Sequence, residues 1–238
     1  MREKVAAIVL AAGRGSRMNS DIHKQYLDLG GKPVLFYSLE TFEKSFVDEI
    51  VLVTGADEID YCRSEIVEKY GFSKVTKIIA GGEERYHSVW NGLRAIESCD
   101  VVMIHDGARP FVDEAILERC LADVRAHKAC VVGMPVKDTI KLADEESFSK
   151  ETLPRHLLWM IQTPQVFSYD LVLRAFRTFM DREKELLAEG IQITDDAMVV
   201  EHFTNTSVKL TEGSYENIKI TTPEDLPHAE MILKTRKL

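Results

Sequence analysis

Residues 5–18 read VAAIVLAAGRGSRM, an apolar run that passes directly into a basic glycine turn. The run at 5–10 has no polar alternation, which is typical of a strand buried on both faces of a sheet. The small residues and glycines after it let the backbone approach a ligand closely, with its N–H groups turned inward. Arg17 and Lys24 add positive charge beside those donors. The stretch therefore predicts a first strand followed by a loop that suits a polyphosphate.

This loop differs from the two common phosphate-binding loops. It lacks the third glycine of G-x-G-x-x-G, and it lacks the G-K-[ST] of the Walker loop. A strand followed by a glycine turn also begins many α/β domains. The phosphate role therefore depends on what the rest of the chain provides.

Composition narrows the class of protein. The net charge of −9 argues against a general nucleic-acid-binding protein, although local Arg and Lys can still bind a small anion. The four cysteines form no C-x-x-C pair and have no histidine at metal-ligand spacing, which favours reduced thiols. The apolar N-terminal run has no convincing cleavage site, and no segment reaches the length of a membrane span. We expect a cytoplasmic protein with neither a nucleic-acid nor a membrane partner.

Apolar runs alternate with amphipathic stretches up to Val136. Strands are expected at 5–10, 50–54, 77–80, 101–104 and 130–135, and helices at 34–42, 89–96 and 116–124. Such alternation implies an α/β fold, with a mostly parallel sheet between two layers of helices. Ligands bind such sheets at the carboxyl ends of the strands. The turn at Gly13, Gly81-Gly82 and His105-Asp106 all stand at such ends.

The alternation breaks after Val136. Residues 137–142 look like an alternating strand, 143–152 are polar, and LPRHLLW at 153–159 completes a predicted two-stranded arm. Because an isolated hairpin is marginal in water, this arm suggests a dimer.

The C-terminal part resumes the regular pattern. We expect a helix at 170–189, a strand near 208–210 and a final helix from Pro223, with Thr222 as its N-cap. No repeat or low-complexity linker interrupts the chain. The prediction is one domain, 1–238, with a dimerisation arm at about 137–159.

The Gly81-Gly82 turn opens a predicted helix that carries Arg85 and Ser88 on one face. Free N–H groups at a helix start attract anions or base-edge acceptors. The alternative is an ordinary strand–helix connection with a solvated arginine.

Asp106 and Arg109 follow the fourth expected strand. Asp106 is well placed for Mg²⁺ that phosphates also bind, and Arg109 can hold a second anionic group. Alternatively, Asp106 caps the helix at 114–126 and Arg109 pairs with a surface carboxylate. His105 is expected to be packed or hydrogen-bonded, because no nucleophile accompanies it.

Lys219 lies in a short predicted strand, 217–221, where it needs an anion or else faces solvent. The segments 162–167 and 194–197 read as polar turns or caps. The chain shows no Ser-His-Asp set, no thiol nucleophile with a base and no zinc cluster. This favours chemistry by positioning and electrostatics, as in nucleotidyl or phosphoryl transfer.

The motifs taken together resemble a known family. In order they are AAGRGSRM with KQY, GGEERYHSV, HDGARP, DTIK, LWMIQTPQVF, TDDA and NIKITTPEDL. The chain resembles the 2-C-methyl-D-erythritol 4-phosphate cytidylyltransferases of the non-mevalonate isoprenoid pathway. The resemblance implies a Rossmann-like three-layer nucleotidyltransferase fold with a protruding β-arm used in dimerisation. It also implies Mg²⁺-dependent transfer of CMP from CTP to methylerythritol phosphate, which releases pyrophosphate.

The resemblance implies roles for individual residues. The residues expected to line the CTP site are Ala11, Ala12, Gly13, Gly15, Gly82, Glu83, Arg85 and Ser88. The cations expected around the α-phosphate are Arg17, Lys24 and Lys219. The residues expected to hold the sugar phosphate are Asp106, Arg109, Thr139, Arg155, Thr163 and Thr194, of which Asp106 would also face the metal. In a homodimer, the arm would deliver part of this pocket to the partner's site.

Three other readings remain open. A ribitol 5-phosphate cytidylyltransferase shares the fold and CTP site, although AAG, TDDA and PEDL favour the isoprenoid enzyme. A Rossmann dehydrogenase is disfavoured by the missing third glycine and by Arg17. A CTP-binding sensor would bind the nucleotide without turnover. Two departures from the family pattern are Gly107, where alanine is expected, and Glu83, where some relatives carry aspartate.

Overall fold

A seven-stranded sheet in the order β11-β7-β10-β6-β1-β4-β5 forms the centre of the computed structural model, which describes residues 2–13 and 23–236. The pairings β1–β4, β1–β6, β4–β5 and β7–β11 are parallel, whereas β10 runs antiparallel to both β6 and β7. The strands are β1 (Val5–Ala11), β4 (Glu49–Thr54), β5 (Val75–Ala80), β6 (Val101–Asp106), β7 (Ala129–Pro135), β10 (Trp159–Ser168) and β11 (Lys209–Glu212). The mostly parallel α/β sheet is therefore confirmed, and so are the expected strands up to β7.

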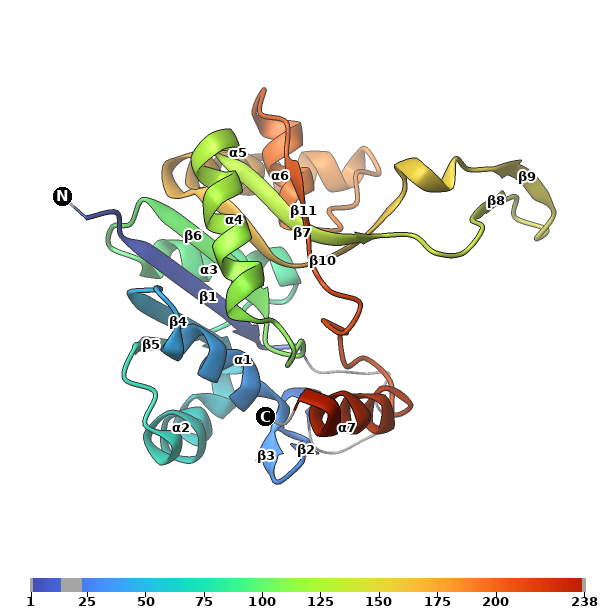
Figure 1. Ribbon diagram of the computed structural model, residues 1–238. Coiled ribbons are helices and arrows are strands. Elements are labelled where there is room, and N and C mark those ends of the chain that lie inside the picture. The colour runs from blue at the N-terminus through green and yellow to red at the C-terminus, as the bar shows by residue number, and fades with distance from the viewer. Residues whose placement is uncertain (1, 14–22, 237–238) are drawn as a thin grey trace.

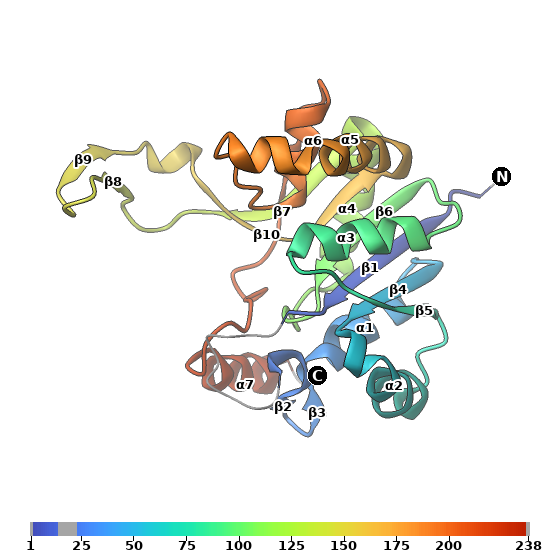
Figure 2. The same ribbon diagram turned by 180° about the vertical axis from the view of Figure 1, so that it is seen from behind.

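Alternate side chains of β1 enter two different hydrophobic layers. Val5, Ala7 and Val9 pack in the cluster that includes α1 and α4, whereas Ala6 and Ile8 pack in the cluster that includes α3 and α5. Figure 1 shows α1 and α4 in front of the sheet, and the reverse view in Figure 2 shows α3 and α5 there. The helices are α1 (Val34–Lys44), α2 (Ile59–Tyr61), α3 (Arg85–Ala95), α4 (Glu114–His127), α5 (Tyr169–Ala188), α6 (Asp196–Phe203) and α7 (Asp225–Arg236). This is the three-layer arrangement expected from the unbroken apolar run.

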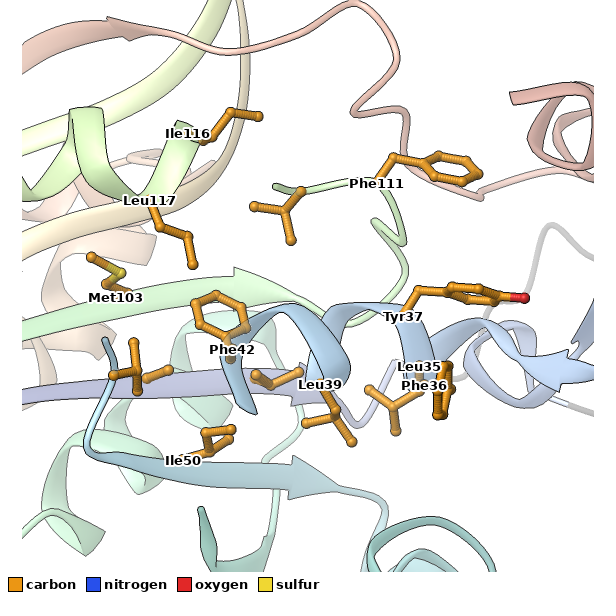
Figure 3. Close-up of a cluster of buried hydrophobic side chains, with 14 of the residues drawn as sticks. Leu35, Phe36, Tyr37, Leu39, Phe42, Ile50, Met103, Phe111, Ile116 and Leu117 are labelled. Atoms are coloured by element: carbon orange, nitrogen blue, oxygen red, sulfur yellow. The ribbon is translucent and has the colours of Figure 1, made fainter. Parts of the chain in front are cut away.

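Helix α1 places its apolar stripe against the sheet. Leu39 and Phe42 are fully buried in the cluster that also contains Met103 of β6 and Leu117 of α4, and Figure 3 shows Phe42 beside Leu117. Because Leu39 and Phe42 are three residues apart, they lie on one face of α1, and packing of that face against the sheet buries both side chains. Burial of side chains of this size stabilises the fold by about 1.5–3 kcal/mol each.

The central strand β10 was not expected. Residues 162–167 read as a polar turn in the sequence, but they lie within β10 and pair with β6 and β7. The ladder to β7 shifts register between Ile161 and Gln165, and the Thr163–Pro164 peptide bond is cis. The prediction was wrong because Pro164 and three polar residues interrupt the apolar pattern, and a proline in a sheet belongs at such an irregularity.

The arm projects from the body between β7 and β10 (Figure 1). Its two antiparallel strands are β8 (Lys141–Ala143) and β9 (Ser149–Thr152). The existence of two strands matches the expectation, but their positions do not: 137–140 are not strand, and β9 lies in the segment expected to be an irregular polar stretch. The sequence SKET of β9 has no apolar residue, and all four residues are exposed, so no burial pattern marked it.

Near the C-terminus, α5 and β11 agree with the predictions at 170–189 and 208–210. The segment 217–221 is not a strand, although Ile220 N–H donates to Ala108 O at 2.9 Å. Helix α7 begins at Asp225, so Thr222 is not its N-cap; instead the Asp225 carboxylate accepts the N–H of Thr222 at 2.9 Å. Within the described part of the chain, the helices are all too short or too polar to span a membrane.

Candidate functional site

Two glycine turns meet at the carboxyl edge of the sheet. A Cβ added to Gly81, which follows β5, would lie 2.5 Å from the Ala12 Cβ, which follows β1. The Gly82 N–H donates to Ser88 Oγ at 3.1 Å, so this turn is tied to the first turns of α3. Only a residue without a side chain fits at position 81. The sequence expectation that the two turns share one sheet edge is thus confirmed.

Lys24 begins a short 3-10 helix, η2 (Lys24–Tyr26), that lies against the end of β1. The Gln25 side chain is buried and donates to the carbonyl of Ala11. This contact holds the Lys24 segment beside the first glycine turn. Two predicted residues of that turn, Gly15 and Arg17, lie outside the described residues.

Asp106, the last residue of β6, lies between two cations. Lys219 Nζ is 2.7 Å from its Oδ2, and Arg85 Nε donates to its Oδ1 at 3.2 Å. Burial alone would raise the pKa of Asp106, but the charges of Arg85, Lys219 and Arg109 hold it well below its usual range. Lys219 therefore has an anion as its partner. Asp106 does not cap α4, because Asp113 does so by accepting the N–H of Ile116.

A second carboxylate, Asp196, holds the other end of the Arg85 guanidinium. Arg85 donates from Nη1 to Oδ1 at 2.8 Å and from Nη2 to Oδ2 at 2.9 Å, a bidentate pair. Asp196 is 1% exposed, and this burial raises its pKa while the charge of Arg85 opposes the rise. Burial lowers the pKa of Arg85, but Asp196 and Asp106 together raise it above its usual range. Arg85 is thus a bridge between two carboxylates.

His105 and Arg109 brace the edge of the site from within. His105 is fully buried, lies 3.0 Å from Thr163 Oγ1 through Nδ1 and 3.1 Å from Arg109 O through Nε2. Burial lowers the pKa of His105 to about 4, so its ring is neutral at pH 7. Arg109 Nη1 donates to Asn217 O at 2.8 Å, and burial lowers its pKa. His105 is packed and hydrogen-bonded as expected, and none of the described surface carboxylates forms an ion pair with Arg109.

A cleft of about 280 Å³ opens over this cluster. Its lining includes the sequence-predicted residues Arg85, Asp106, Arg109, Thr163, Thr194 and Lys219. It does not include two predicted residues of the arm. Thr139 and Arg155 are exposed, and Arg155 Nη1 donates to Lys137 O at 2.9 Å. The cleft therefore brings together six of the predicted residues, whereas the two predicted residues of the arm lie outside it. The other described residues of the predicted set are not among its lining residues: Ala11, Ala12, Gly13, Lys24, Gly82, Glu83 and Ser88.

Sequence reasoning missed several residues that shape the cleft. Gln165 of β10 donates to Asp195 Oδ2 at 3.1 Å and accepts the N–H of Ala197 at 2.8 Å, which fixes the start of α6 against the sheet. Asp195 is the N-cap of α6. The paired acids at 195–196 carried a signal: one acid can cap a helix, and a second one buried behind it requires a cation.

The donor set limits how a metal can bind. Across residues 2–13 and 23–236, His, Cys, Asp and Glu side chains form no group of three that could hold a metal ion. Asp106 is an ionised carboxylate that lines the cleft, and Asp195 is a second acidic residue of the same lining. This fits Mg²⁺, which commonly binds through one or two carboxylates together with substrate phosphates.

Comparison with known proteins gives a consistent result. The family model described as 2-C-methyl-D-erythritol 4-phosphate cytidylyltransferase matches residues 5–235. Proteins of that name from Clostridium kluyveri and Lachnoclostridium phytofermentans are 51% and 47% identical to this chain; the first alignment covers 97% of both chains, and the second covers 98% of this chain and 97% of the relative. The crystal structure of 4-diphosphocytidyl-2C-methyl-D-erythritol synthase from Anaerococcus prevotii is similar, with a TM-score of 0.84, 33% identity, and coverage of 98% and 96%. A cytidylyltransferase structure from Thermus thermophilus has a TM-score of 0.75 and 28% identity, with coverage of 95% and 98%.

Proposed function

Because this chain belongs to the 2-C-methyl-D-erythritol 4-phosphate cytidylyltransferase family, we propose that it transfers CMP from CTP to 2-C-methyl-D-erythritol 4-phosphate. The products are 4-diphosphocytidyl-2-C-methyl-D-erythritol and pyrophosphate, in isoprenoid precursor synthesis. The observation that carries the proposal is the ionised Asp106 between Arg85 and Lys219 at the floor of the cleft. A carboxylate among fixed cations suits a reaction between two phosphorylated substrates.

The reaction is a displacement at phosphorus. A phosphate oxygen of the acceptor forms a bond to the α-phosphorus of CTP, the bond from that phosphorus to the β-phosphate oxygen breaks, and pyrophosphate leaves with the electron pair. Negative charge at the α-phosphate oxygens is greater in the transition state than in CTP, so cations fixed there lower the barrier. We assign this role to Arg17, Lys24 and Lys219. Of these, Lys219 lies against the cleft with its ammonium on Asp106.

The nucleotide side of the proposal rests on the two packed glycine turns. The N–H groups of Gly81 and Gly82 are already bound, to Thr54 O at 2.8 Å and to Ser88 Oγ at 3.1 Å. We therefore assign anion binding at this edge of the sheet to the backbone of the first glycine turn. We assign CTP contacts to Ala11, Ala12, Gly13, Gly15, Gly82, Glu83, Arg85 and Ser88. For Arg85, the two carboxylate partners add a second role, which is to orient Asp106.

Asp106 would hold Mg²⁺ together with the nucleotide phosphates. When bound, the metal supplies positive charge to the phosphate oxygens. The low pKa of Asp106 matters here, because it keeps the carboxylate ionised across the physiological range. Arg85 fixes the orientation of the carboxylate from the opposite side.

The acceptor side combines two copies of the chain in this proposal. Arg109, Thr163 and Thr194 line the cleft of one protomer, whereas Thr139 and Arg155 stand on the exposed arm. We propose a homodimer in which the arm brings the latter two to the partner's cleft. The arm also exposes apolar surface that a partner would cover: Phe148 is 68% and Leu157 is 67% exposed. We place the enzyme in the cytoplasm, where CTP is available.

The test is pyrophosphate release by the purified protein with CTP and Mg²⁺. The reaction is run with methylerythritol 4-phosphate and, separately, with ribitol 5-phosphate. Release with the first acceptor alone supports the proposal. Release with ribitol 5-phosphate alone would keep the chemistry and overturn the acceptor, and CTP binding without release from either would favour a sensor.

A further inference from the structure

A carboxylate outside the cleft contacts both sides of the Lys24 segment. Glu58 follows β4 on the chain, and its Oε1 lies 2.5 Å from His23 Nδ1. Its other oxygen, Oε2, accepts the hydroxyl of Tyr26 at 3.1 Å. Lys24 and Gln25 stand between these two contacts in the sequence. One side chain thus fixes the residue before Lys24 and the residue two positions after it.

Glu58 is itself held firmly by the end of β4. The Gly55 N–H and the Thr54 hydroxyl both donate to Oε2, at 3.1 and 3.2 Å. The carboxyl side chain is only 13% exposed. A Cβ added to Gly55 would lie 2.7 Å from Oε2, so the glycine provides the space that the carboxylate occupies. A carboxylate that is largely shielded from water and has four donors around it is a rigid anchor rather than a solvated surface charge.

The Lys24 segment therefore has anchors on two adjacent strands. Gln25 is fixed to the carbonyl of Ala11 at the end of β1, and Tyr26 is fixed to Glu58 and to Thr54 Oγ1 at the end of β4. A lysine ammonium sits on a flexible four-carbon stem, so the position of its backbone sets how often it reaches a given point. Fixing that backbone reduces the ordering left to the reaction itself.

We propose that Glu58 is a positioning residue for Lys24, holding the segment His23–Tyr26 so that the ammonium reaches the α-phosphate of CTP. The inference rests on the proposed function, because it takes Lys24 as a phosphate ligand. Both carboxylate oxygens of Glu58 are bound within the protein, by His23 on one side and by Tyr26, Thr54 and Gly55 on the other, so it acts through the segment and not on the substrates.

The test is a double-mutant cycle with Glu58→Gln and Lys24→Ala. Glutamine keeps the length of the side chain but removes the charge that the His23 and Tyr26 contacts use. In the parent enzyme, Glu58→Gln should lower kcat/KM for CTP roughly tenfold, because small misplacement of a catalytic group is expensive. In the Lys24→Ala background the same change should alter kcat/KM less than about twofold, since the group being positioned is gone. Equal losses in both backgrounds, or no loss in the parent, would overturn the proposal.

Two further variants keep the result interpretable. Glu65→Gln is the matched control, because this exposed carboxylate pairs only with Lys69 among its described ion pairs, and it should leave kcat/KM unchanged. Tyr26→Phe removes one of the two contacts between Glu58 and the segment. It should lower kcat/KM for CTP less than Glu58→Gln does, and the loss should again disappear in the Lys24→Ala background. If Glu58→Gln does not fold, the cycle with Tyr26→Phe tests the proposal in its place.

The same double-mutant cycle can be measured on the affinity for CTP, by calorimetry in the absence of an acceptor. This measurement does not depend on turnover. Failure of the parent enzyme to use methylerythritol phosphate would refute the proposed function. The cycle of CTP affinities would then test the role of Glu58. If the losses of affinity from Glu58→Gln and Lys24→Ala simply add, the positioning role is overturned.

Discussion

Arg85→Met should destabilise the fold through the two carboxylates that it leaves behind. Methionine fills similar volume but has no charge. Asp196, which is 1% exposed, would lose both of its bidentate contacts, and Asp106 would keep only Lys219 of its two closest cations. The change therefore strands a buried negative charge beside a second one.

The structure sets the size of the effect. Removing one partner of a buried ion pair costs about 3–5 kcal/mol. The Arg85 side chain is 31% exposed, so water can reach the site and the lower end of that range applies. We expect the free energy of unfolding at pH 7 to fall by about 3 kcal/mol, which is a drop in Tm of about 6–12 °C for a domain of this size.

Urea denaturation at pH 7 and pH 5, followed by circular dichroism, measures this directly. Arg85 lowers the pKa of Asp196 against the effect of burial, so the variant should bind a proton there that the parent does not. The difference in the free energy of unfolding between parent and variant should therefore be smaller at pH 5 than at pH 7. Arg182→Met is the control, because its pair with Glu185 is exposed to solvent and contributes little to stability. A loss at pH 7 no larger than the control's would refute the reasoning.

Three other predictions follow from the same site. Lys24→Ala and Arg17→Ala should each lower kcat by on the order of a hundredfold, by analogy with loss of one oxyanion donor; an unchanged kcat at saturating substrates would remove them from the catalytic set. Arg155→Ala should raise KM for the sugar phosphate while leaving CTP affinity nearly intact, whereas Lys150→Ala on the same arm should change neither; equal loss of affinity for both ligands would contradict the assignment. Burial lowers the pKa of His105 from its ordinary value of 6.5 to about 4, so the unfolded chain binds the proton first and stability should be lost as pH falls from about 6.5 to about 4, by about 3 kcal/mol in total. His105→Gln should lack that part of the pH dependence in chemical denaturation, and a parallel pH profile would count against the buried neutral ring.

Most strands of the sheet could be predicted from the sequence because their burial is visible as continuous apolar runs. The apolar runs at β1, β4 and β6 have no alternation, since helices cover both of their faces. The same reasoning failed at β10. Three of its buried residues are Gln162, Thr163 and Gln165, whose polar groups bind Ser214, Asp106 and Asp195 across the edge of the cleft. A strand that serves a site loses the pattern by which strands are recognised.

The candidate site divides in a similar way. Asp106 was predicted from its place at the end of a strand, and Lys219 because a lysine among apolar neighbours requires an anion; in the structure they are partners of each other. Asp196 and Glu58 were not predicted, because each lies in a polar stretch where a carboxylate gives no sign of burial, and their partners, Arg85 and His23, lie more than thirty residues away. Such pairings depend on the crossing of distant strands, which no local pattern contains.

The placement of β10 also sets an order for assembly during synthesis. Strands β1, β4, β5 and β6 are adjacent in the sheet and come from the first 106 residues, so they can pair as they leave the ribosome. β7 cannot join them, because β10, which separates it from β6, is made only after the whole arm. Until then β6 presents a bare row of backbone donors and acceptors, the kind of edge that recruits other chains. The late arrival of β10 therefore makes the nascent chain dependent on protection of one strand edge, and it makes the arm's length a determinant of how long that edge stays open.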